Sequence, residues 1–363
     1  QSRKLPQNDL HDFYITFLDG EHIMNDHKQT IVYTKQPKVC SWSSVVGPKE
    51  GRGPLKDAFD FVMPSPEYNQ NSYEAAEQAM LNSAANICIE KANMHPQQVQ
   101  AMLGGDLLNQ IISTSFTARE MGISFLGLYG ACSTMAESLL LGAMLVDGDY
   151  ASPVLCTAGS HYCTAERQFR YPLEYGNQRT PAAQWTVTGG GACLLHKCKG
   201  NVCITHGTIG RVVDLGVKDA NNMGAAMAPA AADTLFRHFC DTGRAPKDYD
   251  RIFSGDLGQI GSSLLKQLMK EKTFPLEDEK YQDCGNMIFD PEDDVHAGAS
   301  GCGCSASVLA AHILPRLESG EWKRVLFMAT GALMSTVSSQ QGESIPGIAH
   351  AVAFEHVESR KKG

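Results

Sequence analysis

The chain has 363 residues, of which 43% are hydrophobic, and its formal net charge is −9 at pH 7. This length and composition allow a large buried core and argue against disorder. The excess of acidic residues argues against broad nucleic-acid binding, because a protein that binds nucleic acids needs a basic surface. The strongest apolar stretch, 139–146, is followed by Asp147, Gly148 and Asp149 and is too short to span a bilayer, so we expect any membrane association to be peripheral.

Twelve cysteines are spread through apolar and helical contexts. In a chain of this size they are more typical of buried free thiols in a reducing compartment than of a disulfide framework. No Cys-x-x-Cys pair occurs. Cys302 and Cys304 lie two residues apart and would share one face of a strand, which leaves a metal site open as an alternative.

Residues 1–28 are polar and show little periodicity, and Met24 is a candidate native start. We therefore treat 1–28 as an N-terminal extension, with an origin in an expression vector or an upstream reading frame as the interpretation, and exclude it from the fold.

Two segments 150 residues apart share one pattern: 95–110 (HPQQVQAMLGGDLLNQ) and 245–260 (APKDYDRIFSGDLGQI). Each is an apolar run followed by Gly-Asp-Leu, so that Asp106 matches Asp256. The segments that precede them, 72–94 and 224–244, have apolar residues at intervals of three and four, which predicts a helix in both places.

A second pair of segments, 131–160 and 303–332, is offset by 172 residues and places Cys132 opposite Cys304. The larger offset predicts an insertion in the second copy, near the charged segment 271–294. The expected organisation is a first half at 29–200, a second half at 201–355 and a tail at 356–363.

Each half is predicted to run strand, helix, Gly-Asp-Leu strand, helix, Cys-bearing turn, helix and apolar strand. Strands that alternate with long helices indicate an α/β fold with mainly parallel, doubly covered sheets. Two such halves packed about a pseudo-two-fold axis would bury their equivalent helices between them. The turns at the ends of corresponding strands would then converge on one pocket.

This organisation, with a Cys at the start of a first-half helix, resembles the thiolase and ketoacyl-synthase superfamily, whose duplicated fold has five layers (αβαβα). The strings GGDLLNQ, GACST, AERQFRYPLEYG, MGAAMAPAAADT, GASGCGCSA and ESIPGIAHAVAFE are together similar to the stage V sporulation protein AD family. That resemblance implies binding of dipicolinic acid, for its uptake into the developing spore and its release in germination. It further implies a homodimer that is peripheral to the spore inner membrane and acts with the other proteins of the stage V sporulation A membrane complex.

Cys132 raises the question of catalysis. A thiolate at a helix N-terminus is stabilised by free N–H groups and by the dipole, which favours acyl transfer. The alternative is a small side chain that only packs against the other half. Superfamily enzymes also carry a His from the second half, whereas this chain has Asp256 at the corresponding strand end. The remaining candidate base is His296, although counting back from Gly320 places its position nearer to 300–303.

We therefore expect a binding protein without catalysis, with an acyltransferase or condensing enzyme using Cys132 as the first alternative and a scaffold with a vestigial pocket as the second. Arg167 and Arg170 could clamp carboxylates or pair with Glu166 or Glu174. No cofactor is expected beyond Ca²⁺ carried in the ligand chelate, and no protein metal site is expected. The candidate ligand-binding residues are Cys132, Asp106, Asn109, Ser160, His161, Thr164, Asp256 and His296. For Asp106, Asn109 and Asp256, a role in turns and helix caps is an equally good interpretation.

Overall fold

The structure is a computed structural model that describes residues 28–169, 179–290 and 292–358. A serine begins the first long helix, because the Ser72 side chain accepts a hydrogen bond from the Ala75 N–H. The first half consists, in chain order, of β2 (Lys38–Val46), α2 (Tyr73–Lys91), β4 (Ala101–Gly105), α3 (Ile112–Met121), β5 (Phe125–Gly127), α4 (Thr134–Asp147), β6 (Val154–Ser160) and β8 (Gly189–His196).

The second half repeats the same order of elements. Its first long helix is capped by the Asn222 side chain and ends at Gly243, whose φ of 68° suits a residue without a Cβ. The elements are β9 (Val202–Thr208), α6 (Met223–Thr242), β10 (Arg251–Ser254), α7 (Gly258–Glu271), β11 (Tyr281–Asp283), α8 (Cys302–Val308), β13 (Arg324–Ala332) and β14 (Gly347–His356).

Shorter elements complete the described part of the chain. A π-helical turn, Leu309–Ile313, connects α8 with α9. The other short elements that the argument uses are β1 (Thr30–Val32), β3 (Phe61–Val62), η4 (Ala131–Ser133), α5 (Tyr162–Phe169), β7 (Trp185–Thr186), β12 (Ala299–Ser300), α9 (Leu314–Glu318) and α10 (Thr336–Gln340).

One large mixed sheet confirms the predicted duplication. The strands of the first half lie in the order β5-β4-β6-β8-β2, and their equivalents in the second half lie in the order β11-β10-β13-β14-β9. In each half the three strands farthest from the junction are parallel, and the remaining pairs are antiparallel. The halves join where β2 and β9 pair at Lys38 with Cys203 and at Val39 with Val202.

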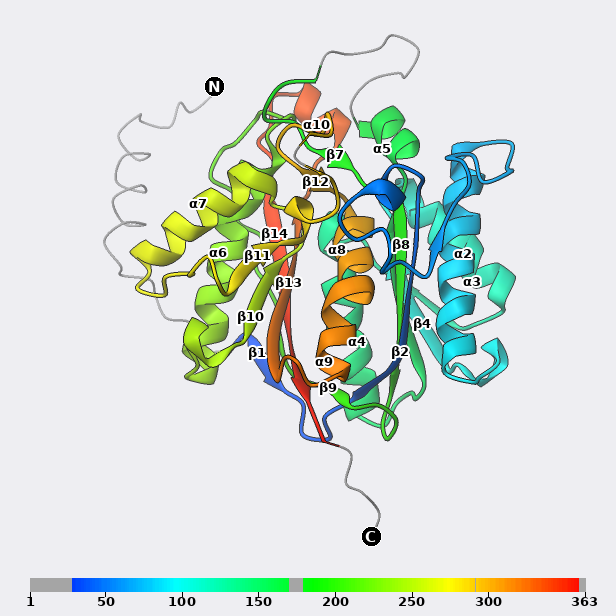
Figure 1. The fold of residues 1–363 in the computed structure, drawn as a ribbon. Coiled ribbons are helices and arrows are strands. Elements are labelled where there is room, and N and C mark those ends of the chain that lie inside the picture. Colours follow the sequence, from blue (N-terminus) through cyan, green and yellow to red (C-terminus); the bar gives the residue numbers. More distant parts are fainter. Residues whose placement is uncertain (1–27, 170–178, 291, 359–363) are drawn as a thin grey trace, which may run out of the picture.

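The helices give the five predicted layers. Figure 1 shows α4 and α8 between the two halves of the sheet, with α2 and α3 on one outer face and α6 and α7 on the other. The central layer packs closely because glycines face it. A Cβ on Gly191 of β8 would lie 2.6 Å from the Ala306 carbonyl oxygen of α8. This contact lets β8 pack directly against the backbone of α8.

The charged segment 271–294 contains β11, which pairs with β10 as β5 pairs with β4. The extra residues of the second half therefore flank a strand that both halves share. The short strands β5 and β11 were not predicted, since three residues carry too little periodicity.

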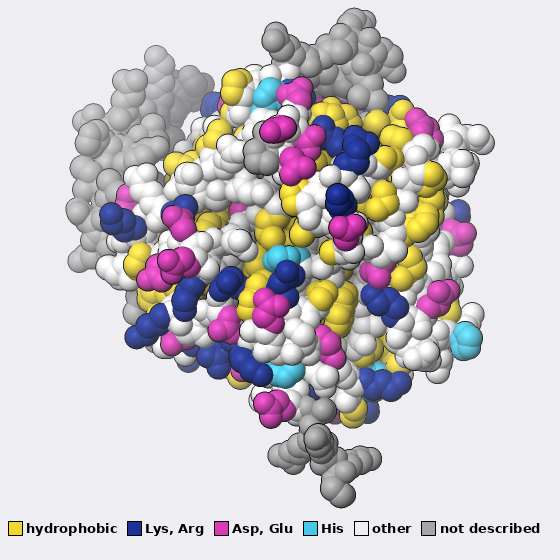
Figure 2. All heavy atoms as spheres, in the orientation of Figure 1, with side chains coloured by type: hydrophobic (Ala, Val, Ile, Leu, Met, Phe, Trp, Pro, Cys, Tyr) yellow, Lys and Arg dark blue, Asp and Glu magenta, His cyan; other side chains and the backbone are white. Residues whose placement is uncertain are grey.

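Two surface properties bear on possible partners. Figure 2 shows Lys, Arg, Asp and Glu side chains intermixed over the face in view. Among the described residues, no helix combines the length and the apolar character that a membrane span requires.

Candidate functional site

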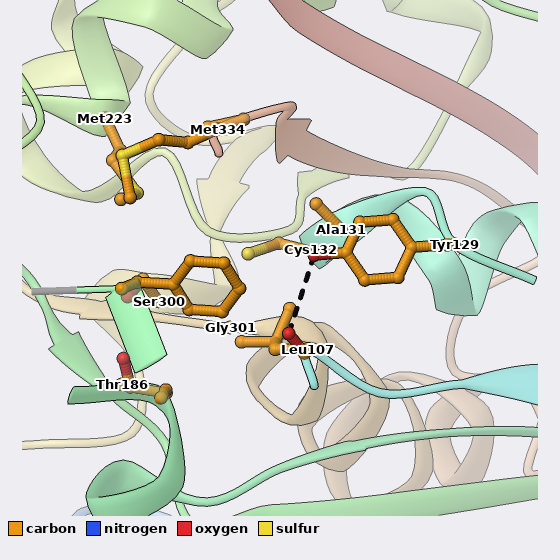
Figure 3. A pocket seen from close by; sticks show the side chains of 12 residues that line it. Leu107, Tyr129, Ala131, Cys132, Thr186, Met223, Ser300, Gly301 and Met334 are labelled. Carbon is orange, nitrogen blue, oxygen red and sulfur yellow. Dashed lines mark hydrogen bonds between the residues drawn. The ribbon is translucent and has the colours of Figure 1, made fainter. Parts of the chain in front are cut away.

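A pocket opens where the turns of the two halves meet, as the duplication predicted. The space that no atom fills is about 450 Å³, including the part open to solvent. Figure 3 shows Cys132 and Tyr129 from one turn facing Ser300 and Gly301 from the other half, with Met223 and Met334 to one side. The lining residues are Leu107, Tyr129, Ala131, Cys132, Ala165, Phe169, Thr186, Met223, Ser300, Gly301, Ala332 and Met334.

Cys132 lies in η4, the short turn that leads into α4. The turn is tight, since Ala131 has a φ of 49° and the Ser133 hydroxyl donates to the Gly130 carbonyl at 2.7 Å. The backbone of β13, in the second half, packs directly against this turn. The contact is so close that a Cβ on Gly331 would lie 2.3 Å from the Gly130 carbonyl oxygen. The thiol is buried and reaches the pocket from a rigid backbone.

Asp256 is the acidic neighbour of this thiol. Its carboxylate accepts the Gly301 N–H at 2.9 Å and the Thr330 hydroxyl at 2.8 Å, and it interacts directly with the Cys132 side chain. Burial raises the pKa of Asp256 to about 6. Burial, followed by the charge of Asp256, raises the pKa of Cys132 well above its usual range. The thiol is therefore neutral, which is the opposite of the thiolate that a helix N-terminus alone would favour.

Asp106 occupies the equivalent turn of the first half, but its side chain hydrogen-bonds to the backbone and the Thr114 hydroxyl of its own turn. Its carboxylate accepts the Leu108 N–H at 2.9 Å and both the N–H and the hydroxyl of Thr114 at 2.7 Å. These contacts close the turn and cap α3, in agreement with the capping interpretation. Asn109 is exposed, and its side-chain oxygen accepts a hydrogen bond from Gln168 of α5 at 3.1 Å. Neither residue lines the pocket, whereas Leu107 between them does.

The predicted ligand-binding residues at the end of β6 and in α5 point away from the pocket. The Ser160 hydroxyl donates to the Val187 carbonyl at 2.7 Å, and the Thr164 hydroxyl donates to Glu77 at 2.6 Å. His161 Nε2 lies 2.8 Å from the Pro66 carbonyl, and its Nδ1 accepts the Cys163 N–H. All three side chains are buried, and the Ser160 hydroxyl oxygen also accepts the Gly303 N–H of α8 at 3.2 Å. Ala165 and Phe169 of α5 line the pocket instead.

The arginine clamp does not form at Arg167, whose guanidinium pairs with Glu74 at 2.9 Å. This partner is neither of the two acids that the sequence suggested. Arg170 and Glu174, the remaining residues considered for the clamp, lie outside the described residues.

His296 lies before β12, and its Nε2 is 3.3 Å from a carboxylate oxygen of Asp294. It does not line the pocket. Ser300 and Gly301 form that wall, as the count back from Gly320 suggested. No His, Lys, Arg, Asp or Glu occurs among the described residues that line the pocket.

Sequence reasoning missed one polar residue that shapes this wall. The buried Gln184 amide donates to the Asp256 carbonyl at 2.7 Å and to the Ala299 carbonyl at 2.8 Å, and so holds the Asp256 turn against β12. It also missed Thr186, Met223, Met334 and Phe169, since hydroxyl and apolar side chains carry no chemical signature in a sequence.

The structure gives no support to a metal site at Cys302 and Cys304. Both lie in α8 rather than in a strand, and their thiols donate to different carbonyls, those of Gly159 at 2.9 Å and Gly255 at 3.4 Å. Over the described ranges, no group of three or more His, Cys, Asp or Glu side chains is placed to hold a metal ion.

The same fold occurs in solved structures of low sequence identity. The 3-oxoacyl-[acyl-carrier-protein] synthase III of Aquifex aeolicus is 11% identical, with a TM-score of 0.53 over 88% of this chain and 100% of that one. Cerulenin-bound OleA of Xanthomonas campestris is 12% identical, with a TM-score of 0.59 over 89% of this chain and 98% of that one. At this identity the similarity establishes the fold alone.

Two sequence comparisons establish the family. The family profile described as Stage V sporulation protein AD (SpoVAD) matches residues 27–355. The Stage V sporulation protein AD of Bacillus subtilis (strain 168) is 45% identical over 328 residues, which are 90% of this chain and 97% of that protein. The chain therefore belongs to the stage V sporulation protein AD family, on a thiolase-like fold.

Proposed function

We propose that this sporulation protein binds dipicolinic acid, free or as its calcium chelate, in the Cys132 pocket without turning it over. The observation that carries the proposal is that the carboxylate of Asp256 lies beside the Cys132 thiol. The thiol interacts with a carboxylate that raises its pKa, where an acyl-transfer enzyme needs a base that lowers it. The pocket thus keeps the shape of a thiolase-like site while its nucleophile is held neutral.

The lining suits a small planar ligand. The rings of Tyr129 and Phe169 and the side chains of Leu107 and Met334 offer apolar contacts for a flat ring. The hydroxyls of Thr186 and Ser300 lie on the same wall and can donate to a carboxylate. Ca²⁺ in a chelate would neutralise the ligand charge and contribute no bond to the described lining.

In the cell, we place this binding step in dipicolinate uptake by the developing spore and in its release during germination. The protein would act there with the membrane proteins of the stage V sporulation A complex, attached peripherally to the inner membrane. Family membership supports this assignment.

A homodimer is the second part of the proposal, and the two ends of the sheet support it. At one end, β11 buries Tyr281 and Asp283. At the other, the equivalent strand β5 exposes Leu126 by 52%, with Phe116 and Tyr129 also exposed, and no strand of the described ranges pairs with its outer edge. A bare apolar edge strand invites pairing, and a second copy related by a two-fold axis would extend the sheet through β5.

An acyltransferase is the second candidate function, because Cys132 reaches the pocket from a turn that leads into a helix. Incubation with acyl-coenzyme A followed by intact-mass measurement separates the two functions. We expect no acyl adduct on Cys132, together with saturable dipicolinate binding in equilibrium dialysis. An adduct that forms stoichiometrically on Cys132 would favour the transferase and overturn the proposal.

A further inference from the structure

A buried carboxylate, that of Asp256, lies behind the wall of the pocket that Cys132 and Gly301 form. Asp256 receives the Gly301 N–H on Oδ2 and the Thr330 hydroxyl on Oδ1, and the Cys132 side chain contacts it from the pocket side. Asp256 itself is fully buried, so a ligand in the pocket meets the Cys132 sulfur first and the carboxylate lies behind it.

A thiol has only one hydrogen to donate. Before a ligand binds, that hydrogen serves Asp256, and the Gly301 N–H and the Thr330 hydroxyl serve it as well. A carboxylate ligand that approaches Cys132 therefore meets a sulfur whose proton is already used. Two carboxylates would then lie on either side of one thiol, with a single proton between them.

The described surroundings of Asp256 offer no positive charge that would resolve this conflict. The titratable groups on which the charge of Asp256 acts are Asp283 of β11 and the buried thiols of Cys132, Cys284, Cys302 and Cys304. No Lys, Arg or His acts on Asp256 within the described residues. Two like charges this close in a buried site destabilise each other unless one is neutralised.

We propose that a carboxylate ligand enters this pocket together with one proton, which Asp256 takes up. The protonated carboxyl then donates to the Cys132 sulfur, and the thiol turns its own hydrogen toward the ligand oxygen. Every acceptor in the resulting chain has a donor. The proton that enters from solvent forms an O–H bond on Asp256, and otherwise only hydrogen bonds form or break. This inference rests on the proposed binding function and specifies how that site is regulated by pH.

Proton uptake makes binding weaken as the pH rises. Asp256 is mostly ionised in the ligand-free protein above a pH of about 6. From there upward, linkage predicts that the affinity falls about tenfold per pH unit for one bound proton. Asp256→Asn has an amide N–H in place of the acid proton and no charge at any pH, so its affinity is expected to be independent of pH over the same range.

The test is calorimetric titration with dipicolinate, without Ca²⁺, at pH 7.5 in phosphate and in Tris, whose ionisation enthalpies differ. The dependence of the binding enthalpy on the buffer measures the protons taken up. We expect about one for the wild type and for Glu137→Gln, a matched control that removes a partly buried acid of α4 outside the pocket, and none for Asp256→Asn.

The outcomes are distinguishable. Wild-type binding with no proton uptake would overturn this inference and leave the proposed function intact. A folded wild type that does not bind dipicolinate at any pH would overturn the proposed function and this inference with it. If Asp256→Asn does not fold, the wild-type titration alone decides between these results.

Discussion

The thiol of Cys132, which lines the pocket, and the carboxylate of Asp256, which is buried behind it, come from opposite halves of the duplicated chain and act on each other. The carboxylate is fixed by Gly301 and Thr330, and Gln184 holds its turn. A neutral thiol beside an acid is a poor nucleophile, although it lies in a turn that leads into a helix. The predictions below follow from this pair and from the packing that supports it.

Asp256 should protect Cys132 from alkylation. In Asp256→Asn the charge that raises the thiol pKa is removed, and each unit of pKa corresponds to about a tenfold change in thiolate fraction. We expect Cys132 to react with iodoacetamide roughly tenfold faster in this variant, as measured by peptide mass spectrometry. The exposed Cys198 and Cys240 are internal controls and should react equally in both proteins. Fast, selective reaction of Cys132 in the wild type would contradict the neutral thiol.

Buried acids should make the protein less stable at higher pH. Burial raises the pKa of Glu50 and Asp283 to about 7 and that of Asp256 to about 6. Each pKa is higher in the folded state than in the unfolded state, so the stabilisation is complete below the unfolded values near 4 and is lost as the pH rises through 6 and 7. We expect the melting temperature to fall by several °C, as an order of magnitude, between pH 5 and pH 8.

Glu50→Gln tests the origin of this slope. The Gln side-chain oxygen can still accept the Thr188 N–H that Glu50 accepts at 2.9 Å, while the titrating group is gone. The variant should show a flatter decline of melting temperature with pH. A decline as steep as that of the wild type would assign the slope to other groups.

His161 should matter for stability and not for binding. In His161→Ala the Pro66 carbonyl and the Cys163 N–H lose their partner, which costs about 1–3 kcal/mol when such groups are buried. We expect a lower melting temperature with an unchanged dipicolinate affinity. A variant that keeps its stability and loses dipicolinate binding would show that His161 contacts the ligand, contrary to this prediction.

The close contact between the sheet and the central helices can be tested on one strand. Gly191→Ala places a methyl group 2.6 Å from the Ala306 carbonyl and should cost about 1–3 kcal/mol of folding free energy. Gly190→Ala is the matched control, since the nearest atoms to its Cβ would be the ends of two flexible side chains, Leu81 at 3.3 Å and Met80 at 3.7 Å. Denaturant titration of both variants measures the difference, and equal stabilities would contradict the packing described for α8.

The proposed dimer depends on the edge of β5. Leu126→Asp introduces a charge at this edge and should yield a monomer in light scattering coupled to size exclusion. Val32→Asp is the control, because Val32 is exposed by 61% on β1, away from β5. A dimer that survives Leu126→Asp, or a wild type that is monomeric, would rule out pairing through β5.

Much of the fold could be predicted because the sequence contains an internal duplication. The two Gly-Asp-Leu strands and the two Cys-bearing turns are independent records of one architecture, and the difference between their offsets indicated extra residues between strand and turn in the second half. The convergence of turns from both halves on one pocket followed from the same symmetry. The short strand β5 has no comparable signal in its three residues, and neither has β11.

The pocket lining was harder to predict, because one residue of helical or strand register decides which side a side chain takes. Thr164 turns to Glu77, whereas the adjacent Ala165 lines the pocket. Asp106 looked equivalent to Asp256, but its carboxylate is occupied by its own turn. Met223 and Met334 come from segments far apart in the chain, and only the folded arrangement brings them to one pocket.

The most direct measurement is a calorimetric titration of the protein with dipicolinate, beside one variant that fills the pocket and one that does not. Ala332→Phe places a ring in the pocket, and Ala58→Phe adds the same ring at an exposed position outside it. Saturable binding by the wild type and Ala58→Phe, lost in a folded Ala332→Phe, is the predicted result. Absence of binding by the wild type, or equal binding by all three proteins, would contradict a ligand site at Cys132 and Asp256.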